Sequence, residues 1–189
     1  MRTLILLSSV AFLAVALAAP IPREIKAPEL IVNGSFEDGP DTEVYVSLDE
    51  KSTSIKGWTV TRGQIDYIAA HWIAADGKRS LDLHGSPGFG GVKQTIKTEQ
   101  GKTYRVTFMM AGNPGVGTKL MTLAVYANKE SKKFEFDCTD KTIEEMGWSK
   151  KTWDFKADAD ETVIEIATAM TEEPFAGPAL DNVSVKLLK

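Results

Sequence analysis

Apolar and polar residues alternate one by one along several stretches of this chain, and this period of two constrains the fold more than any other feature. It is clearest in Thr103–Gly112, Val163–Met170 and Asp181–Leu187. Successive side chains of an extended strand point to opposite faces, so these stretches predict strands with one buried face. Shorter β-like pieces lie at Leu30–Phe36, Gly57–Thr61, Gln64–Ile68, Ser80–Leu83, Val92–Thr98, Leu120–Tyr126, Lys133–Phe136 and Thr152–Lys156.

Turn residues separate nearly all of these pieces, among them Asn33-Gly34, Asp76-Gly77 and Asn113-Pro114-Gly115. About ten short strands with such punctuation predict an all-β fold, an antiparallel sandwich of two sheets. One stretch, Lys141–Met146, has a helical pattern about a turn and a half long.

The first 19 residues are typical of a secretory signal peptide. A positive start at Arg2 precedes an apolar run from Leu4 to Leu17, and Ala16 and Ala18 stand at the spacing that signal peptidase recognises. The alternative is an uncleaved anchor, but the run is shorter than the roughly 20 residues that span a bilayer. We therefore expect a signal at 1–19, a Pro-rich linker at 20–28 and one domain at 29–189, secreted or in the cell envelope and with no membrane attachment after cleavage.

Charge and cysteine content exclude some classes of function. The formal net charge is −4 and the isoelectric point about 5.3, whereas a nucleic-acid binder usually shows a basic stripe and a high isoelectric point. Cys138 is the only cysteine and cannot form an intramolecular disulfide. It could be a nucleophile or an intermolecular link, but a small buried residue near a strand end is the favoured interpretation.

No catalytic signature is present in the sequence. His71 and His84 belong to no metalloprotease or hydrolase motif, and two histidines with one distant cysteine make a poor zinc site. With 26 acidic residues, pairs of carboxylates are unavoidable and indicate nothing. We expect a protein that is not an enzyme.

The tryptophans suggest a binding site. Trp58 and Trp153 belong to β-like pieces and are expected in the core, whereas Trp72 lies in a stretch without alternation that should be a loop. An indole on a loop can stack on the C–H face of a sugar, with polar groups taking the hydroxyls. An equally plausible interpretation is a Trp that caps one end of the sandwich. The candidate ligand-binding residues are Trp72, Asp66, His71, His84 and Asn113.

Glu37 and Asp181 are candidate metal ligands. By strict alternation Asp181 shares a face with three apolar residues, an expensive place for a carboxylate unless it is paired or binds a cation. A calcium ion held by both carboxylates and backbone carbonyls would solve that problem. A strand-end Asp that accepts backbone N–H bonds is the alternative.

Six motifs of the chain resemble those of a known family: LIVNGSFEDGP, GWTV, IDYI, AADGKRSLDLHGSPGFGGVKQTI, YRVTFMMAGNP and GPALDNVSV. The chain resembles the bacterial choice-of-anchor C proteins and the related plant cell-wall proteins of the domain-of-unknown-function 642 family, from about Leu30 to Val185. The resemblance implies a galactose-binding-like jelly roll, an extracellular or cell-wall setting, association with polysaccharide, and a structural Ca²⁺ shared by Glu37 and Asp181.

Pattern and resemblance together predict that the first and last strands lie close together and that the core contains Tyr104, Phe108, Val183 and Val185. The leading function is a secreted, non-catalytic module that binds cell-wall or extracellular polysaccharide. The alternative is a structural or protein-interaction domain of the envelope without a sugar site.

Overall fold

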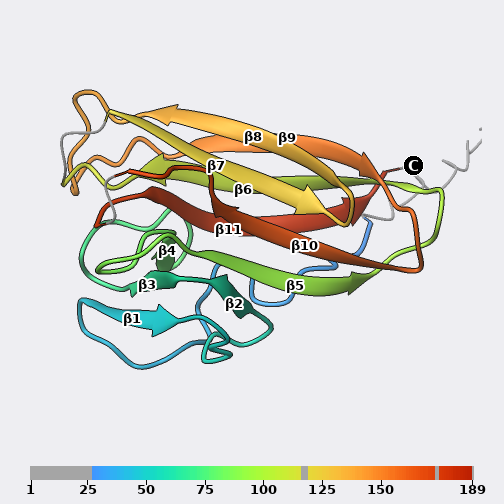
Figure 1. Ribbon diagram of the computed structural model, residues 1–189, viewed down its shortest axis with the longest axis horizontal. Helices are drawn as coiled ribbons and strands as arrows, with labels where there is room; N and C mark the ends of the chain where they lie inside the picture. Colours follow the sequence, from blue (N-terminus) through green and yellow to red (C-terminus); the bar gives the residue numbers. More distant parts are fainter. Residues whose placement is uncertain (1–26, 116–118, 173–174, 189) are drawn as a thin grey trace, which may run out of the picture.

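Two antiparallel sheets face each other in the computed structural model, which describes residues 27–115, 119–172 and 175–188 (Figure 1). The expected signal peptide and most of the expected linker lie outside the described residues. Within those residues, no helix is long and apolar enough to cross a membrane.

The larger sheet has six strands in the order β1-β3-β4-β11-β6-β9. The smaller has five, in the order β2-β5-β10-β7-β8. The strands are β1 (Tyr45–Asp49), β2 (Thr59–Arg62), β3 (Gln64–Ile68), β4 (Ser80–Asp82), β5 (Gly91–Lys97), β6 (Thr103–Gly112), β7 (Leu120–Ala127), β8 (Glu130–Asp137), β9 (Ser149–Lys156), β10 (Glu161–Thr168) and β11 (Pro178–Leu187). This is the predicted galactose-binding-like jelly roll.

The core fills the space between the sheets. Every second residue of β6, beginning with Tyr104, points into it, and on β11 Val183 and Val185 do the same. Tyr104, Phe108, Val183 and Val185 are at most 3% exposed, which confirms the four predicted core residues. Trp58 is also buried as expected, while Trp153 is half-buried and packs against the core.

The outer face of the six-stranded sheet has two unlike halves. The half on β1, β3, β4 and the first part of β11 carries Asp66, Asp82 and Asp181, and all three are buried. We call it the covered half, because the loop of residues 69–79 lies over it. The half on β6, β9 and the rest of β11 carries Arg105 and Asp154, both well exposed, and we call it the open half.

A bulge in β11 decides which face Asp181 occupies. Asp181 pairs with Met109 but Ser184 pairs with Thr107, so one extra residue stands on β11 between these pairs. Asn182 adopts a φ of 47°, a left-handed conformation that Asn tolerates better than most residues. Asp181 therefore points to the outer face while Val183 points to the core, and the expectation that the two share a face is wrong.

The segment Leu30–Phe36, expected as the first strand, is not one. Positive φ values at Asn33 (55°) and Phe36 (59°) interrupt the extended backbone. The segment nevertheless runs beside β11, with backbone bonds from Leu30 N to Val185 O (3.0 Å) and from Val183 N to Gly34 O (2.9 Å). The first strand is instead β1, which two strands separate from β11.

The expected short helix at Lys141–Met146 is also absent from the described structure, where the segment is a loop. The backbone N–H of Glu145 donates to the carbonyl oxygen of Thr142 at 3.1 Å and to its hydroxyl at 3.1 Å. Met146, next to this bond, is 2% exposed, whereas Ile143 is 37% exposed, so the two apolar residues of the segment do not share a buried face.

Candidate functional site

Asp82 on β4 lies at the centre of a buried polar cluster in the covered half. It is 1% exposed, and its Oδ1 accepts hydrogen bonds from the backbone N–H groups of His84 (2.9 Å) and Gly177 (3.0 Å). Its Oδ2 accepts one from the side-chain amide of Asn113 (2.9 Å). Asp82 thereby ties together the loops that follow β4 and β6 and the loop that precedes β11.

Asp66 lies opposite Asp82 on the neighbouring strand. It accepts hydrogen bonds from the hydroxyls of Ser47 (2.5 Å) and Ser86 (2.7 Å). Burial raises the pKa of Asp82 to about 7, and the charge of Asp66 acts in the same direction, while the donors on His84, Asn113 and Gly177 oppose both.

These contacts place three of the predicted ligand-binding residues inside the protein. Asp66, His84 and Asn113 are 5%, 0% and 9% exposed. The His84 ring nitrogen Nε2 lies 2.8 Å from the Thr168 hydroxyl, and its ring meets the edge of Phe89. The structure brings the three residues together around Asp82, but it does not present them to a ligand as the sequence analysis expected.

Trp72 is also buried, at 4% exposure, and its Nε1 donates to the Ser80 hydroxyl at 2.8 Å. The expectation of an exposed indole platform is therefore corrected: Trp72 holds its loop onto the sheet. His71 lies beside it, with 5.4 Å between ring centroids, and 5.9 Å from the ring of Tyr45. Tyr45 is 44% exposed, so a ligand can reach its ring.

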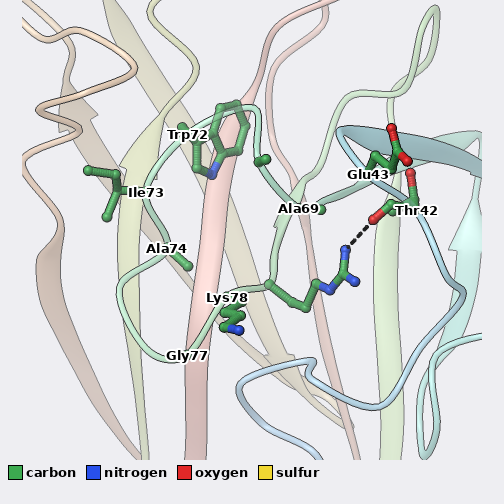
Figure 2. Close-up of a pocket in the computed structure, with 10 residues that line it drawn as sticks. Thr42, Glu43, Ala69, Trp72, Ile73, Ala74, Gly77 and Lys78 are labelled. Atoms are coloured by element: carbon green, nitrogen blue, oxygen red, sulfur yellow. Dashed lines mark hydrogen bonds between the residues drawn. The ribbon is translucent and has the colours of Figure 1, made fainter.

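A pocket of about 380 Å³ opens beside Trp72 (Figure 2). The loop 69–79 curls around it, and Thr42 and Glu43, just before β1, close the opposite side. Its apolar wall consists of three alanines, Trp72 and Ile73. The volume is within the usual range for small-ligand sites, which combine an apolar wall with a few polar groups.

Two cationic side chains, Lys78 and Arg79, line the pocket together with the polar residues Thr42 and Glu43. The Arg79 guanidinium donates to the carbonyl oxygen of Thr42 at 2.9 Å and lies 5.5 Å from the centre of the Tyr67 ring. Tyr45, Lys78 and Arg79 were not among the site residues predicted from the sequence. A usable signal was present in the alternation of VYVSL and in the two cations directly after Asp76-Gly77.

The carboxylates of Glu37 and Asp181 both accept backbone hydrogen bonds from the loop 69–79. Glu37 Oε1 accepts backbone bonds from Lys78 and Arg79, each 2.8 Å long. Asp181 Oδ2 accepts bonds from the N–H groups of Ala75 (2.8 Å) and Asp76 (2.9 Å). Burial raises the pKa of Asp181 to about 7, although these donors oppose the shift.

Calcium needs several oxygen ligands around one point, and N–H donors repel a cation. Here the carboxylates of Glu37 and Asp181 face such donors, and Asp181 Oδ1 takes a further N–H bond from Asn182. No group of three or more His, Cys, Asp and Glu able to hold a metal occurs among the described residues. The arrangement fits the backbone-bonded alternative and does not fit a calcium site, so we assign no role to calcium.

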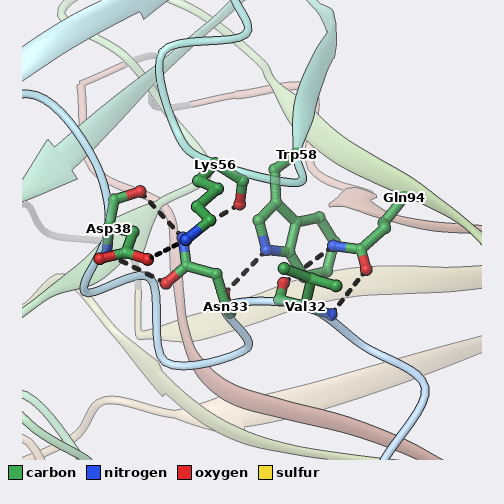
Figure 3. A network of polar contacts seen from close by, with 6 residues as sticks. All are labelled: Val32, Asn33, Asp38, Lys56, Trp58 and Gln94. Atoms are coloured by element: carbon green, nitrogen blue, oxygen red, sulfur yellow. Dashed lines mark hydrogen bonds and ion pairs between the residues drawn. The ribbon is translucent and has the colours of Figure 1, made fainter.

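The segment before β1 is fastened by a second network (Figure 3). The Asn33 side-chain amide donates to the carbonyl oxygens of Asp38 (2.9 Å) and Lys56 (3.1 Å), and Trp58 Nε1 donates to the carbonyl of Asn33 (2.9 Å). Gln94 on β5 exchanges two bonds with the backbone of Val32. This network fixes residues 32–38. It thereby also positions Glu37, which bonds to the backbone of the loop 69–79.

Cys138 is buried, and burial together with nearby acidic charges raises the pKa of its thiol to about 11. A thiol with a raised pKa is a poor nucleophile because the reactive form is the thiolate. Cys138 is therefore a packing residue, the role favoured from the sequence.

Residues 29–186 match the family described as "Protein of unknown function (DUF642)". The chain belongs to this family. Halomucin of Haloquadratum walsbyi is 29% identical over 187 residues, which cover 96% of this chain but 2% of halomucin. The Arabidopsis thaliana protein DUF642 L-galactono-1,4-lactone-responsive gene 2 is 26% identical over 94% of this chain and 47% of its own length. The chain thus spans less than half the length of these relatives.

Solved structures similar to this DUF642 domain include carbohydrate-binding modules. TmCBM61, solved in complex with β-1,4-galactotriose, matches with a TM-score of 0.54 and 14% identity over 86% of this chain and 100% of that chain. The CBM35 of Cellvibrio japonicus Abf62 matches with a TM-score of 0.51 and 15% identity over 75% of this chain and 91% of that chain. At these identities the likeness shows a shared fold.

Proposed function

We propose that this DUF642 domain is a secreted, non-catalytic module that binds polysaccharide in the pocket beside Trp72. The pocket itself carries the proposal: it combines an apolar wall, held rigid by the Trp72–Ser80 bond, with the polar side chains of Glu43, Lys78 and Arg79. It lies in a loop fastened to a rigid sandwich, where such folds place recognition. The shared fold of carbohydrate-binding modules supports the same function.

A sugar has two kinds of surface, and the site has a counterpart for each. The exposed ring of Tyr45, two residues after Glu43 of the pocket, offers a stacking face for the C–H side of a sugar, and the charged side chains can bind hydroxyl groups. One stacked ring contributes about 1–2 kcal/mol, so a single site should bind with Kd values from about millimolar to tens of micromolar.

Native gel electrophoresis through immobilised polysaccharides tests this proposal. The panel contains pectins, xylans, glucans and galactans. We expect at least one polymer to retard the protein and Tyr45→Ala to abolish most of the retardation. Tyr126→Ala is the matched control, because Tyr126 is a half-buried Tyr on β7 of the other sheet. Equal retardation of wild type and Tyr45→Ala would place the site elsewhere.

Secretion is part of the proposal and has its own test. The small residues, the end of the apolar run and Pro20 coincide only after Ala18 or Ala19. Sequencing the N-terminus of exported protein should therefore find Ala19 or Pro20 first. An intact Met1 on exported protein would contradict this.

A protein-interaction domain is the second candidate, and one observation favours it. A neighbouring pocket of about 370 Å³ lies between His71 and Glu144, and two isoleucines of its lining, Ile73 and Ile143, are 66% and 37% exposed. Exposed apolar side chains that lie together mark interaction surfaces. If no polysaccharide in the panel retards the protein, this function takes precedence.

A further inference from the structure

The side chains that line the pocket beside Trp72 carry one net positive charge. Lys78 and Arg79 are its two cations and Glu43 its one acid. Neither cation forms an ion pair with another described residue. This is notable in a chain whose formal net charge is −4 and whose other exposed cations include several in ion pairs, such as Arg105 with Asp154.

Contacts with Glu37, Thr42 and Tyr67 position the Arg79 side chain and the backbone of both cationic residues. Glu37 Oε1 accepts the backbone N–H bonds of both Lys78 and Arg79, so their backbone is fixed relative to the sheet. The Arg79 guanidinium is further held by the Thr42 carbonyl and lies over the Tyr67 ring. A guanidinium positioned in advance loses less entropy when it binds a carboxylate.

The surroundings of Arg79 strengthen such a bond. Arg79 is half-buried, and Trp72 and Ile73 contribute apolar surface to the same pocket. Low local polarity reduces the screening that weakens exposed ion pairs. A ligand that fits this pocket has an anionic group attached directly to a compact, partly apolar body.

We propose that the pocket selects sugar residues that bear a carboxylate, with Arg79 and Lys78 binding the carboxylate and the apolar wall contacting the sugar ring. The planar guanidinium matches a planar carboxylate with two parallel hydrogen bonds, which a tetrahedral sulfate accommodates less well. This proposal rests on the proposed function, because it names the class of polysaccharide that the same pocket takes.

A pair of polymers that differ only in the carboxylate tests it. The probes are polyglucuronate and the neutral glucan obtained by reducing its carboxyl groups, with dextran sulfate as an anionic polymer that lacks carboxylates. In titrations of the mature chain we expect polyglucuronate to bind at least tenfold more tightly than either of the others, and the preference to shrink as salt is raised.

Three single-residue variants test which side chains cause the preference for polyglucuronate. Lys78→Gln and Arg79→Gln should each weaken polyglucuronate binding about five- to tenfold and weaken binding of the neutral glucan by a clearly smaller factor, because glutamine can still form hydrogen bonds with hydroxyl groups. Lys78 is exposed, and its side chain has no hydrogen bond or ion pair with a described residue, so Lys78→Gln keeps the test valid even if Arg79→Gln disturbs the fold. Lys150→Gln on the open half is the matched control and should bind as the wild type does.

Each outcome decides between the two proposals. Equal binding of polyglucuronate and the neutral glucan would overturn carboxylate selection and leave polysaccharide binding intact. Stronger binding to dextran sulfate, or a loss with Lys150→Gln instead of Lys78→Gln, would show general attraction of anions and also overturn it. If the protein binds none of these probes or the wider panel, the proposed function fails first.

Discussion

The covered and open halves lie on the same outer face of the six-stranded sheet and show the same alternation, but aspartate is buried in one half and exposed in the other. Asp82 in the covered half is 1% exposed and accepts three hydrogen bonds from the loops around it. Asp154 in the open half has a side chain that is 40% exposed and pairs with Arg105 across the strand boundary. The difference comes from what lies above the sheet, because loops such as 69–79 cover one half and not the other. The pocket beside Trp72 lies in the covered half, where hydrogen bonds fasten the loop 69–79 to the sheet.

Removing the two carboxylates should give the largest contrast between the halves. Asp82→Ala leaves three buried donors without an acceptor, each of which costs about 1–3 kcal/mol, partly offset because a desolvated carboxylate is removed; we expect a loss of about 3 kcal/mol in the free energy of unfolding. Asp154→Ala removes an exposed ion pair and should cost at most about 1 kcal/mol. Urea denaturation of both variants measures the contrast, and equal losses would contradict it.

The pH dependence of stability should have opposite signs in the two halves. The folded-state pKa of Asp82 is raised by burial to about 7, above its ordinary value of 3.8, so its contribution to stability is complete below about pH 4 and is lost as the pH rises to 7. Hydrogen bonding to Arg105 lowers the pKa of Asp154, whose contribution is present above pH 4 and is lost as the pH falls.

Unfolding free energies measured between pH 3 and pH 8 for Asp82→Asn and Asp154→Asn test these signs. Relative to the wild type, Asp82→Asn should become more stable as the pH rises from 4 to 7. Asp154→Asn should become less stable as the pH rises through 4. If both difference curves are flat, the burial of Asp82 does not govern its protonation.

Adding or removing calcium should have the smallest effect on stability. Because N–H donors face the carboxylates of Glu37 and Asp181, we expect the same melting temperature with added calcium and with a chelator. Asp181→Asn should instead speed amide hydrogen exchange at Ala75 and Asp76, whose N–H groups it holds. A melting temperature that rises with calcium in the wild type but not in Asp181→Asn would restore the calcium site.

The alternation of the sequence, together with the family resemblance, predicted the two sheets and the four core residues. Tyr104, Phe108 and Val185 lie on strands whose one face packs against the other sheet, and period two reports that packing directly. It failed at Asp181 because a bulge at Asn182 inserts one residue, and a single extra residue reverses every side chain beyond it. It also failed at Leu30–Phe36, where two left-handed residues break a strand-like pattern.

The site was harder to predict, because a loop position does not reveal which way a side chain turns. Trp72 does lie in a loop, as its lack of alternation indicated, but the Ser80 hydroxyl directs its indole inward. Asp66, His84 and Asn113 do come together, but around Asp82, a residue that the pattern placed in an ordinary strand. Sequence spacing indicated the loop around Trp72 correctly. It gave no reason to expect that the exposed aromatic ring would be that of Tyr45 and not of Trp72.

The most direct test of the central claim, that the ligand binds where the loop covers the sheet, is a map of backbone amide NMR shifts during titration with a glucuronate oligosaccharide. The largest changes should fall at residues 42–45 and 69–79, with Arg79 among them, and residues 103–107 and 149–154 of the open half should stay unchanged. Shifts concentrated on Arg105, Thr107 and Lys150 instead would show that the open half is the binding face and would contradict the account.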